Sequence, residues 1–328
     1  MAPIIEARSV IKRYRRHKRF RGFGGAIRTL FTREFTEVLA VDGVSFAIEP
    51  GEAIGYLGPN GAGKSTMIKM LTGILVPDGG AVSVLGRTPH LKLTQNAREI
   101  GVVFGQRSQL WWDLPVADSF ELHRRIYAIP DARFRDNLKR LGSMLGVDAF
   151  LEQPVRQLSL GQRMRAEVTM ALLHDPRIVF LDEPTIGLDV VAKDALRKFL
   201  AQVNRERGVT IILTTHDLKD IEEICPRLIM VDEGKLLYDG GIKGLRAALG
   251  TARRLTIEFV ADPGAVTLRA ATLASDEGRI KHYVLTRDDV SIVDVLSEIG
   301  DTSGLKDIAL EEPTIEEVIR TFYQRRAA

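Results

Sequence analysis

The chain has 328 residues, a formal net charge of +3, 45% hydrophobic residues and 27% charged residues. This is the composition of a globular protein, so intrinsic disorder is excluded as a description of the whole chain. Its single cysteine, Cys225, cannot form an internal disulfide, and a cysteine-rich zinc site is excluded as well. No apolar run approaches the ~18 residues that cross a bilayer, so we expect any membrane-spanning part on another chain.

Positive charge is concentrated near the start of the chain. Seven Lys or Arg residues and no acidic residue lie between Lys12 and Arg21, and the remainder is net acidic. A general nucleic-acid-binding surface is therefore not expected. Residues 15–37 combine these charges with aromatic and aliphatic side chains. Three interpretations stay open: contact with an anionic membrane surface, a nucleic-acid patch, or a solvated loop with a short helix packed on a sheet.

The predicted elements alternate between strands and helices. In chain order they are a strand, turn and strand over 44–57, a helix over 63–74, a helix-rich region over 90–175, and strands over 177–181, 209–214 and 227–232. An amphipathic helix with apolar residues on one face lies between the strands over 177–181 and 209–214. Such alternation predicts a parallel sheet covered by helices.

The composition changes after Gly240-Gly241. Residues 253–260 and 280–286 alternate apolar and polar positions, which predicts a small sheet. A final helix is indicated by Thr314 and Glu317, which have the spacing of a capping box. We therefore expect a first domain over 1–242 and a second over 243–328, with a packing or regulatory role.

The strongest motif matches G-x-x-x-x-G-K-[ST] in full, with a predicted strand before it and a helix after it. It consists of Gly58, Pro59, Asn60, Gly61, Ala62, Gly63, Lys64, Ser65 and Thr66. Glycines let backbone N–H groups turn around phosphate oxygens, and the helix N-terminus favours the same anion. Lys64 adds positive charge, and the Ser65 hydroxyl suits Mg²⁺, which prefers oxygen ligands.

Two further patterns follow this motif in the chain. The apolar strand that precedes Asp182 and Glu183 ends where α/β sheets place ligand chemistry. Successive strand residues point opposite ways, so one carboxylate can hold hydrated Mg²⁺ while the other faces a water. The turn Ser159-Leu160-Gly161-Gln162 precedes a helix expected from about Gln162 to His174. Its N-terminus is either a second anion site or an ordinary helix cap.

Together these motifs resemble the ATP-binding subunit of an ABC transporter, over roughly residues 4–240. Gly58–Thr66 resembles the Walker A loop, Asp182 and Glu183 the Walker B pair, and Leu158–Gln162 the LSGGQ signature, with Leu160 in place of the first glycine. The resemblance extends to four further residues. Gln106 resembles the glutamine of the Q-loop and Asp189 the aspartate of the D-loop. His216 resembles the switch histidine, and Tyr14 the aromatic residue that stacks on adenine. Two segments are similar to the drug-exporting branch, which includes daunorubicin-resistance and viologen-exporter types: Val102–Leu114 and the region around 240–249.

The resemblance implies an α/β P-loop NTPase fold. It consists of an ABC-type ATPase domain with a mostly parallel core sheet, an antiparallel β subdomain and a helical subdomain over about 107–170, followed by a small C-terminal α+β domain. It implies ATP and Mg²⁺ as cofactors. Ser65, Gln106 and Asp182 would hold the metal. Glu183 would act as general base and His216 would order the attacking water.

The family's working unit implies three kinds of partner. A second copy would face the first head to tail, so that Ser159–Gln162 and Asp189 of one subunit complete the ATP site of the other. Integral membrane permease subunits would use the motion for export, at the cytoplasmic face of the cell membrane. Trp111 and Trp112 lie either in the groove that receives the permease or in the core. The alternatives are an importer ATPase and a soluble ABC ATPase acting on nucleic acid or ribosomes.

Overall fold

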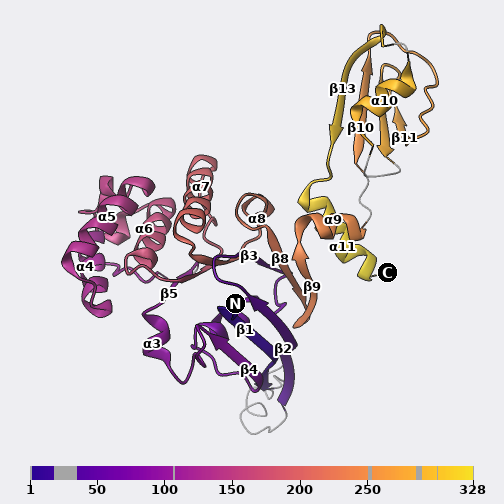
Figure 1. The fold of residues 1–328 in the computed structure, drawn as a ribbon. Helices are drawn as coiled ribbons and strands as arrows, with labels where there is room; N and C mark the ends of the chain where they lie inside the picture. Colours follow the sequence, from indigo (N-terminus) through magenta and orange to yellow (C-terminus); the bar gives the residue numbers. More distant parts are fainter. Residues whose placement is uncertain are drawn as a thin grey trace, which may run out of the picture. The chain divides into compact units, whose positions relative to one another are not determined.

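The computed structural model describes residues 2–17, 35–105, 108–249, 253–285, 290–300 and 302–327 (Figure 1). It divides into two compact units, Met1–Gly241 and Ile242–Ala328. Within the described ranges, no helix has both the length and the apolar character needed to span a membrane.

The first unit is built on a six-stranded sheet with the order β5-β6-β7-β3-β8-β9. The strands are β3 (Ala53–Leu57), β5 (Ile100–Phe104), β6 (Ile178–Asp182), β7 (Thr210–Thr214), β8 (Arg227–Asp232) and β9 (Lys235–Gly241). All neighbours run parallel except β8 and β9. β6 and β7 are built mainly from Ile, Leu, Val and Phe, as expected for strands whose two faces are both covered. β5 lies inside the region predicted to be helix-rich, so the prediction missed this strand. Its five residues, Ile100–Phe104, are too few to show a clear period of their own.

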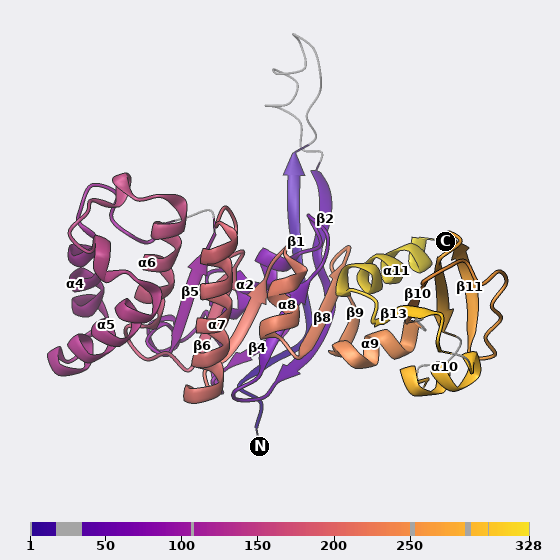
Figure 2. The same ribbon diagram turned by 90° about the horizontal axis from the view of Figure 1, so that it is seen from above.

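A second, antiparallel sheet has the order β2-β1-β4, from strands β1 (Ile5–His17), β2 (Phe35–Ile48) and β4 (Gly79–Val84). Figures 1 and 2 place it on one face of the central sheet, and helices α7 (Val190–Arg207) and α8 (Leu218–Ile224) on the other. Helix α2 (Lys64–Leu71) buries four apolar side chains, Met67, Ile68, Met70 and Leu71, in the core that joins the two sheets. This packing fixes the start of α2 against the end of β3.

Strands β1 and β2 extend further than predicted. The pairing continues to His17 opposite Phe35, and Arg15 forms an ion pair with Glu37 at 3.1 Å. Residues 15–17 and 35–37 are therefore strand, and their interpretation as loop or helix was wrong, because the alternation is masked by consecutive basic residues. The rest of the basic-aromatic segment lies outside the described residues.

The helical part of the first unit contains α3 (Leu93–Ala97), α4 (Val116–Tyr127), α5 (Asp131–Leu145), the short helices η1 (Asp148–Phe150) and η2 (Val155–Gln157), and α6 (Leu160–Leu172). Helix α6 begins two residues before the predicted start, because Ser159 is its N-cap. The Ser159 hydroxyl accepts from the Gln162 N–H, and the Gln162 side chain accepts from the Ser159 N–H. This capping box holds the N-terminus of α6 in a fixed conformation.

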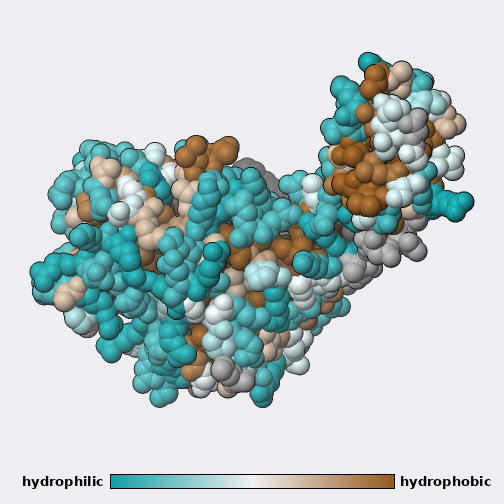
Figure 3. Space-filling view, turned by 45° about the horizontal axis from the view of Figure 1, so that its top comes forward, coloured by the Kyte–Doolittle hydropathy of each residue, from teal (hydrophilic) through white to brown (hydrophobic). Residues whose placement is uncertain are grey.

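The second unit has its own sheet, with the order β11-β12-β10-β13. Its elements are α9 (Ile242–Leu249), β10 (Arg254–Phe259), β11 (Ala271–Asp276), β12 (Ile280–Leu285), α10 (Ile292–Ile299), β13 (Leu305–Glu311) and α11 (Ile315–Ala327). The predicted capping box of the last helix is present, with reciprocal Thr314 and Glu317 bonds of 3.3 Å. A separate apolar core includes Leu255, Ile257 and Tyr283. Figure 3 shows an apolar patch on the visible face of this unit.

Candidate functional site

The glycine-rich loop between β3 and α2 adopts a conformation that its glycines make possible. Gly61 and Gly63 have φ values of 88° and 95°, which other residues rarely adopt. A Cβ on Gly63 would lie 2.1 Å from the Ala40 carbonyl oxygen, and one on Gly58 would lie 2.2 Å from the Val231 carbonyl oxygen. The loop is therefore packed directly against neighbouring backbone.

Lys64 is held inside this loop. Its Nζ donates to the carbonyl oxygens of Gly58 at 2.6 Å and Pro59 at 3.1 Å, and the residue is only 8% exposed. Burial lowers the pKa of the Lys64 ammonium, and the carboxylates of Glu183 and Asp182 oppose that shift. The ammonium is thus positioned at the loop beside two negative charges, where a phosphate would bind.

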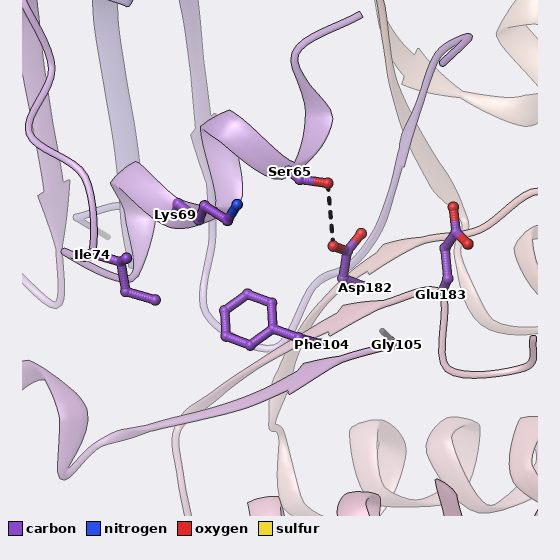
Figure 4. A pocket seen from close by; sticks show the side chains of 7 residues that line it. All are labelled: Ser65, Lys69, Ile74, Phe104, Gly105, Asp182 and Glu183. Atoms are coloured by element: carbon purple, nitrogen blue, oxygen red, sulfur yellow. Dashed lines mark hydrogen bonds between the residues drawn. The ribbon is translucent and has the colours of Figure 1, made fainter. Parts of the chain in front are cut away.

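Asp182 joins three elements at the carboxyl end of the sheet. Ser65 Oγ, at the start of α2, donates to Asp182 Oδ2 at 3.2 Å, and the Thr214 hydroxyl, at the end of β7, donates to Oδ1. Figure 4 shows Ser65 and Asp182 pointing toward each other at the edge of a cavity of about 310 Å³. Its lining residues are Ser65, Lys69, Ile74, Phe104, Gly105, Asp182 and Glu183.

The Glu183 carboxylate lies apart from the Ser65–Asp182 pair, as Figure 4 shows. It follows the last residue of β6 and has a φ of 57°, an uncommon value for a residue with a side chain. Its Oε1 lies 2.8 Å from His216 Nε2, in the loop after β7. The two carboxylates therefore have separate partners, one facing Ser65 and the other facing an imidazole that is half exposed.

A buried polar network lies behind this pair, and the sequence analysis did not predict it. Asp220 is fully buried and accepts hydrogen bonds from Thr185 Oγ1 at 2.6 Å, Thr215 Oγ1 at 2.7 Å and Arg197 Nε at 2.6 Å. Thr185 and Thr215 lie beside Glu183 and His216 in the chain, whereas Arg197 belongs to α7 and Asp220 to α8, so the network ties both loops to these two helices. The sequence feature that could have indicated this network is the Thr-Thr pair that precedes His216 at the end of an apolar strand.

The remaining predicted residues lie in other places. Ser159, Leu160, Gly161 and Gln162 form the N-terminal turn of α6, and Asp189 caps α7 by accepting from the Ala192 N–H at 2.8 Å. Tyr14 lies on β1 opposite Val38, two residues along β2 from the Ala40 carbonyl that Gly63 approaches. Gln106 lies outside the described residues.

The described donors are compatible with Mg²⁺. Ser65 and Asp182 offer two oxygen atoms beside the cavity, and Mg²⁺ in phosphate sites takes few protein ligands with the rest from phosphate and water. A strand, a glycine-rich turn with a buried lysine, a helix N-terminus and an acidic strand end define a P-loop nucleotide-binding site.

Comparisons with known proteins agree with this class. Residues 41–186 match the family model described as ABC transporter. The chain is 32% identical over 208 residues to the ABC transporter ATP-binding protein NatA of Bacillus subtilis, covering 63% of this chain and 84% of NatA. It is 35% identical over 212 residues to the Nod factor export ATP-binding protein I of Ralstonia nicotianae, covering 63% of this chain and 64% of that protein.

A solved structure resembles the same part of the chain. The ATP-binding cassette MJ0796, solved as a dimer in a post-hydrolysis state with ADP and Pi bound, is 25% identical with a TM-score of 0.60. The match covers 72% of this chain and 98% of the cassette. The chain therefore belongs to the ABC transporter ATP-binding family, and the predicted fold class is confirmed. It is an ATP-binding subunit of this family that hydrolyses ATP.

Proposed function

We propose that this chain powers export through separate membrane permease subunits, as a head-to-tail dimer with ATP between the two copies. One observation carries the proposal. A single chain holds both a P-loop site with a buried lysine and, on a different helix, the exposed and rigidly capped N-terminus of α6. The dimer of MJ0796 and the export function in the name of the Ralstonia relative support this assembly and direction.

Each site residue then has a role that follows from its position. Ser65 and Asp182 would hold Mg²⁺, with Gln106 assisting, and the metal would neutralise charge on the phosphates. Glu183 would accept a proton from the attacking water, since its carboxylate is free of Ser65 and oriented by His216 at 2.8 Å. The loop from Gly58 to Thr66 would bind the phosphates, with Tyr14 stacking on adenine. Ser159, Leu160, Gly161, Gln162 and Asp189 would contact the ATP of the second copy.

The surface after β5 supports a permease partner. Trp111 and Trp112 are 56% and 53% exposed, so neither belongs to the core. Adjacent exposed tryptophans are typical of an interface rather than of free surface.

We place the chain at the cytoplasmic face of the membrane, with the basic segment 15–37 toward anionic headgroups and no nucleic acid as partner.

A mixing experiment tests the head-to-tail site. K64A removes the phosphate-binding lysine, and S159R blocks the N-terminus of α6, so each variant alone is inactive. In a mixed dimer one of the two sites is intact, and random pairing restores about a quarter of the wild-type rate. Activity no greater than that of the separate variants would contradict the proposed dimer.

Detergent extraction tests the transport role. A tagged chain that recovers a polytopic membrane protein supports it, and a matched W111A/W112A variant is expected to lose that protein while keeping its ATPase rate. Recovery of RNA or DNA in place of a membrane protein would contradict the proposal.

A further inference from the structure

Two segments of the proposed dimer face pack on each other within one chain. The first is the signature turn, Ser159–Gln162, and the second is the link from Glu183 to Asp189. A Cβ built on Gly187 would lie 2.1 Å from Leu160 Cδ2, so the leucine side chain rests directly on the glycine. In the opposite direction, a Cβ built on Gly161 would lie 3.5 Å from Leu188 Cδ2. Each segment therefore places a leucine on a glycine of the other.

The first of these contacts depends on a residue that departs from the usual signature. Leu160 occupies the position of a glycine, which has no side chain to reach Gly187. Leu160 is 38% exposed, so much of its side chain is covered. Gly187 has a φ of 70°, and it can accept the leucine because it lacks a Cβ.

The link that Leu160 contacts is short and hydrogen-bonded. The Ile186 N–H donates to the Glu183 carbonyl oxygen at 3.3 Å, and the Leu188 N–H donates to that of Thr185 at 3.2 Å. Thr185 is in turn tied to Asp220 at 2.6 Å. Since these bonds stiffen the link, a displacement of the signature turn would be passed along it to the backbone that carries Glu183.

We propose that Leu160 is a positioning residue for ATP hydrolysis: through Gly187 it couples the signature turn, which acts on the second copy's ATP, to the Glu183 of its own chain. This inference rests on the proposed dimer. Its consequence is that each subunit's contact with one ATP influences the general base at the other, with no hydrogen bond required between the two segments.

A double-mutant cycle tests this coupling. G187A introduces the clashing Cβ, and we expect kcat to fall by about tenfold or more while KM for ATP changes by less than about twofold. L160G removes the side chain that the Cβ meets. In the L160G background, the φ of 70° still strains an alanine at position 187, but the clash with Leu160 is gone, so we expect G187A to lower kcat by a clearly smaller factor than it does in the wild-type background.

Three controls separate coupling from misfolding. L160M retains a flexible apolar contact with Gly187 and should lower kcat by a smaller factor than L160G does. V190G in the G187A background removes a neighbouring exposed side chain and should restore nothing. Thermal unfolding of every variant shows whether it is folded. If G187A alone is unfolded, two comparisons of kcat still test the coupling. The first is between L160G and L160G/G187A, and the second is between L160G and L160M.

Independent effects of L160G and G187A on kcat, or an L160G rate equal to wild type, would overturn the coupling. The K64A and S159R mixture is assayed in parallel. Recovery there together with independent effects rejects the coupling alone, whereas independent effects with no recovery reject the dimer on which the coupling rests.

Discussion

Asp182 and Glu183 are neighbours in the chain, yet their carboxylates hold different partners. Asp182 accepts from Ser65 and Thr214, and Glu183 lies 2.8 Å from His216. Strand alternation predicted separate partners from sequence, but Glu183 lies beyond the end of β6 with a φ of 57°, so the backbone turn after the strand, and not alternation within it, separates the two carboxylates. It could not predict the bond from Thr214, or the positive φ of Glu183, which depend on how β6 and β7 align.

Replacing Glu183 by Gln tests the general base. We expect ATP binding to persist, because the P-loop is untouched, and turnover to fall by about 10²–10⁴-fold, because an amide cannot accept the proton. Steady-state phosphate release and nucleotide affinity measure the two effects, and ATP should accumulate a dimer in size-exclusion chromatography. E152Q, a substitution at an exposed site after η1, is the control. A near wild-type rate for E183Q would remove Glu183 from this role.

At the scale of elements, the helical part is joined to the sheet by a histidine pair. His123 of α4 lies 3.2 Å from His174, which follows α6, and His174 Nε2 lies 2.9 Å from the Ile100 carbonyl oxygen of β5. Tyr127 stacks on His123 at 4.1 Å between ring centroids. Sequence periodicity predicted helices in this region, but it could not show that two histidines 51 residues apart meet, because that depends on tertiary packing.

This pair predicts a pH dependence of stability. Burial, followed by the charge of His174, lowers the pKa of His123 to about 3, so the folded state stays neutral where the unfolded histidine, with a pKa near 6.5, takes up a proton. The unfolded state binds more protons between these values, and stability therefore falls as pH decreases from about 6.5 toward 3. One such group contributes at most about 1.4 kcal/mol per pH unit.

Urea unfolding of the wild type and H123Q between pH 7 and pH 4.5 measures this dependence. Glutamine can donate to His174 but does not titrate, so the slope of unfolding free energy against pH should be smaller in the variant. H282Q, in the second unit, should retain the wild-type slope for the first unit. Equal slopes for wild type and H123Q would show that His123 is not the linked group.

At the scale of the whole molecule, the nucleotide site and the second unit are separate in sequence and in core. Every proposed site residue lies between Tyr14 and His216, and the second unit encloses its own apolar cluster. Alternation in 253–260 and 280–286 predicted β10 and β12, and β11 was missed because most of its side chains are exposed. What the second unit binds depends on surface chemistry that these patterns do not encode.

A chain ending at Gly241 tests the independence of the two units. The core of the first unit draws on β1 to β9 and α2, so the truncated chain should fold and bind ATP with an affinity within about threefold of the full chain, because every proposed nucleotide contact lies before Gly241. Isothermal titration and thermal unfolding measure both properties. Residues 242–328 expressed alone should show a cooperative transition, since Leu255, Ile257 and Tyr283 are buried within that unit. A truncated chain that folds but loses ATP affinity by more than about tenfold would show that the second unit acts on the site, and would make it a regulator of binding rather than an independent module.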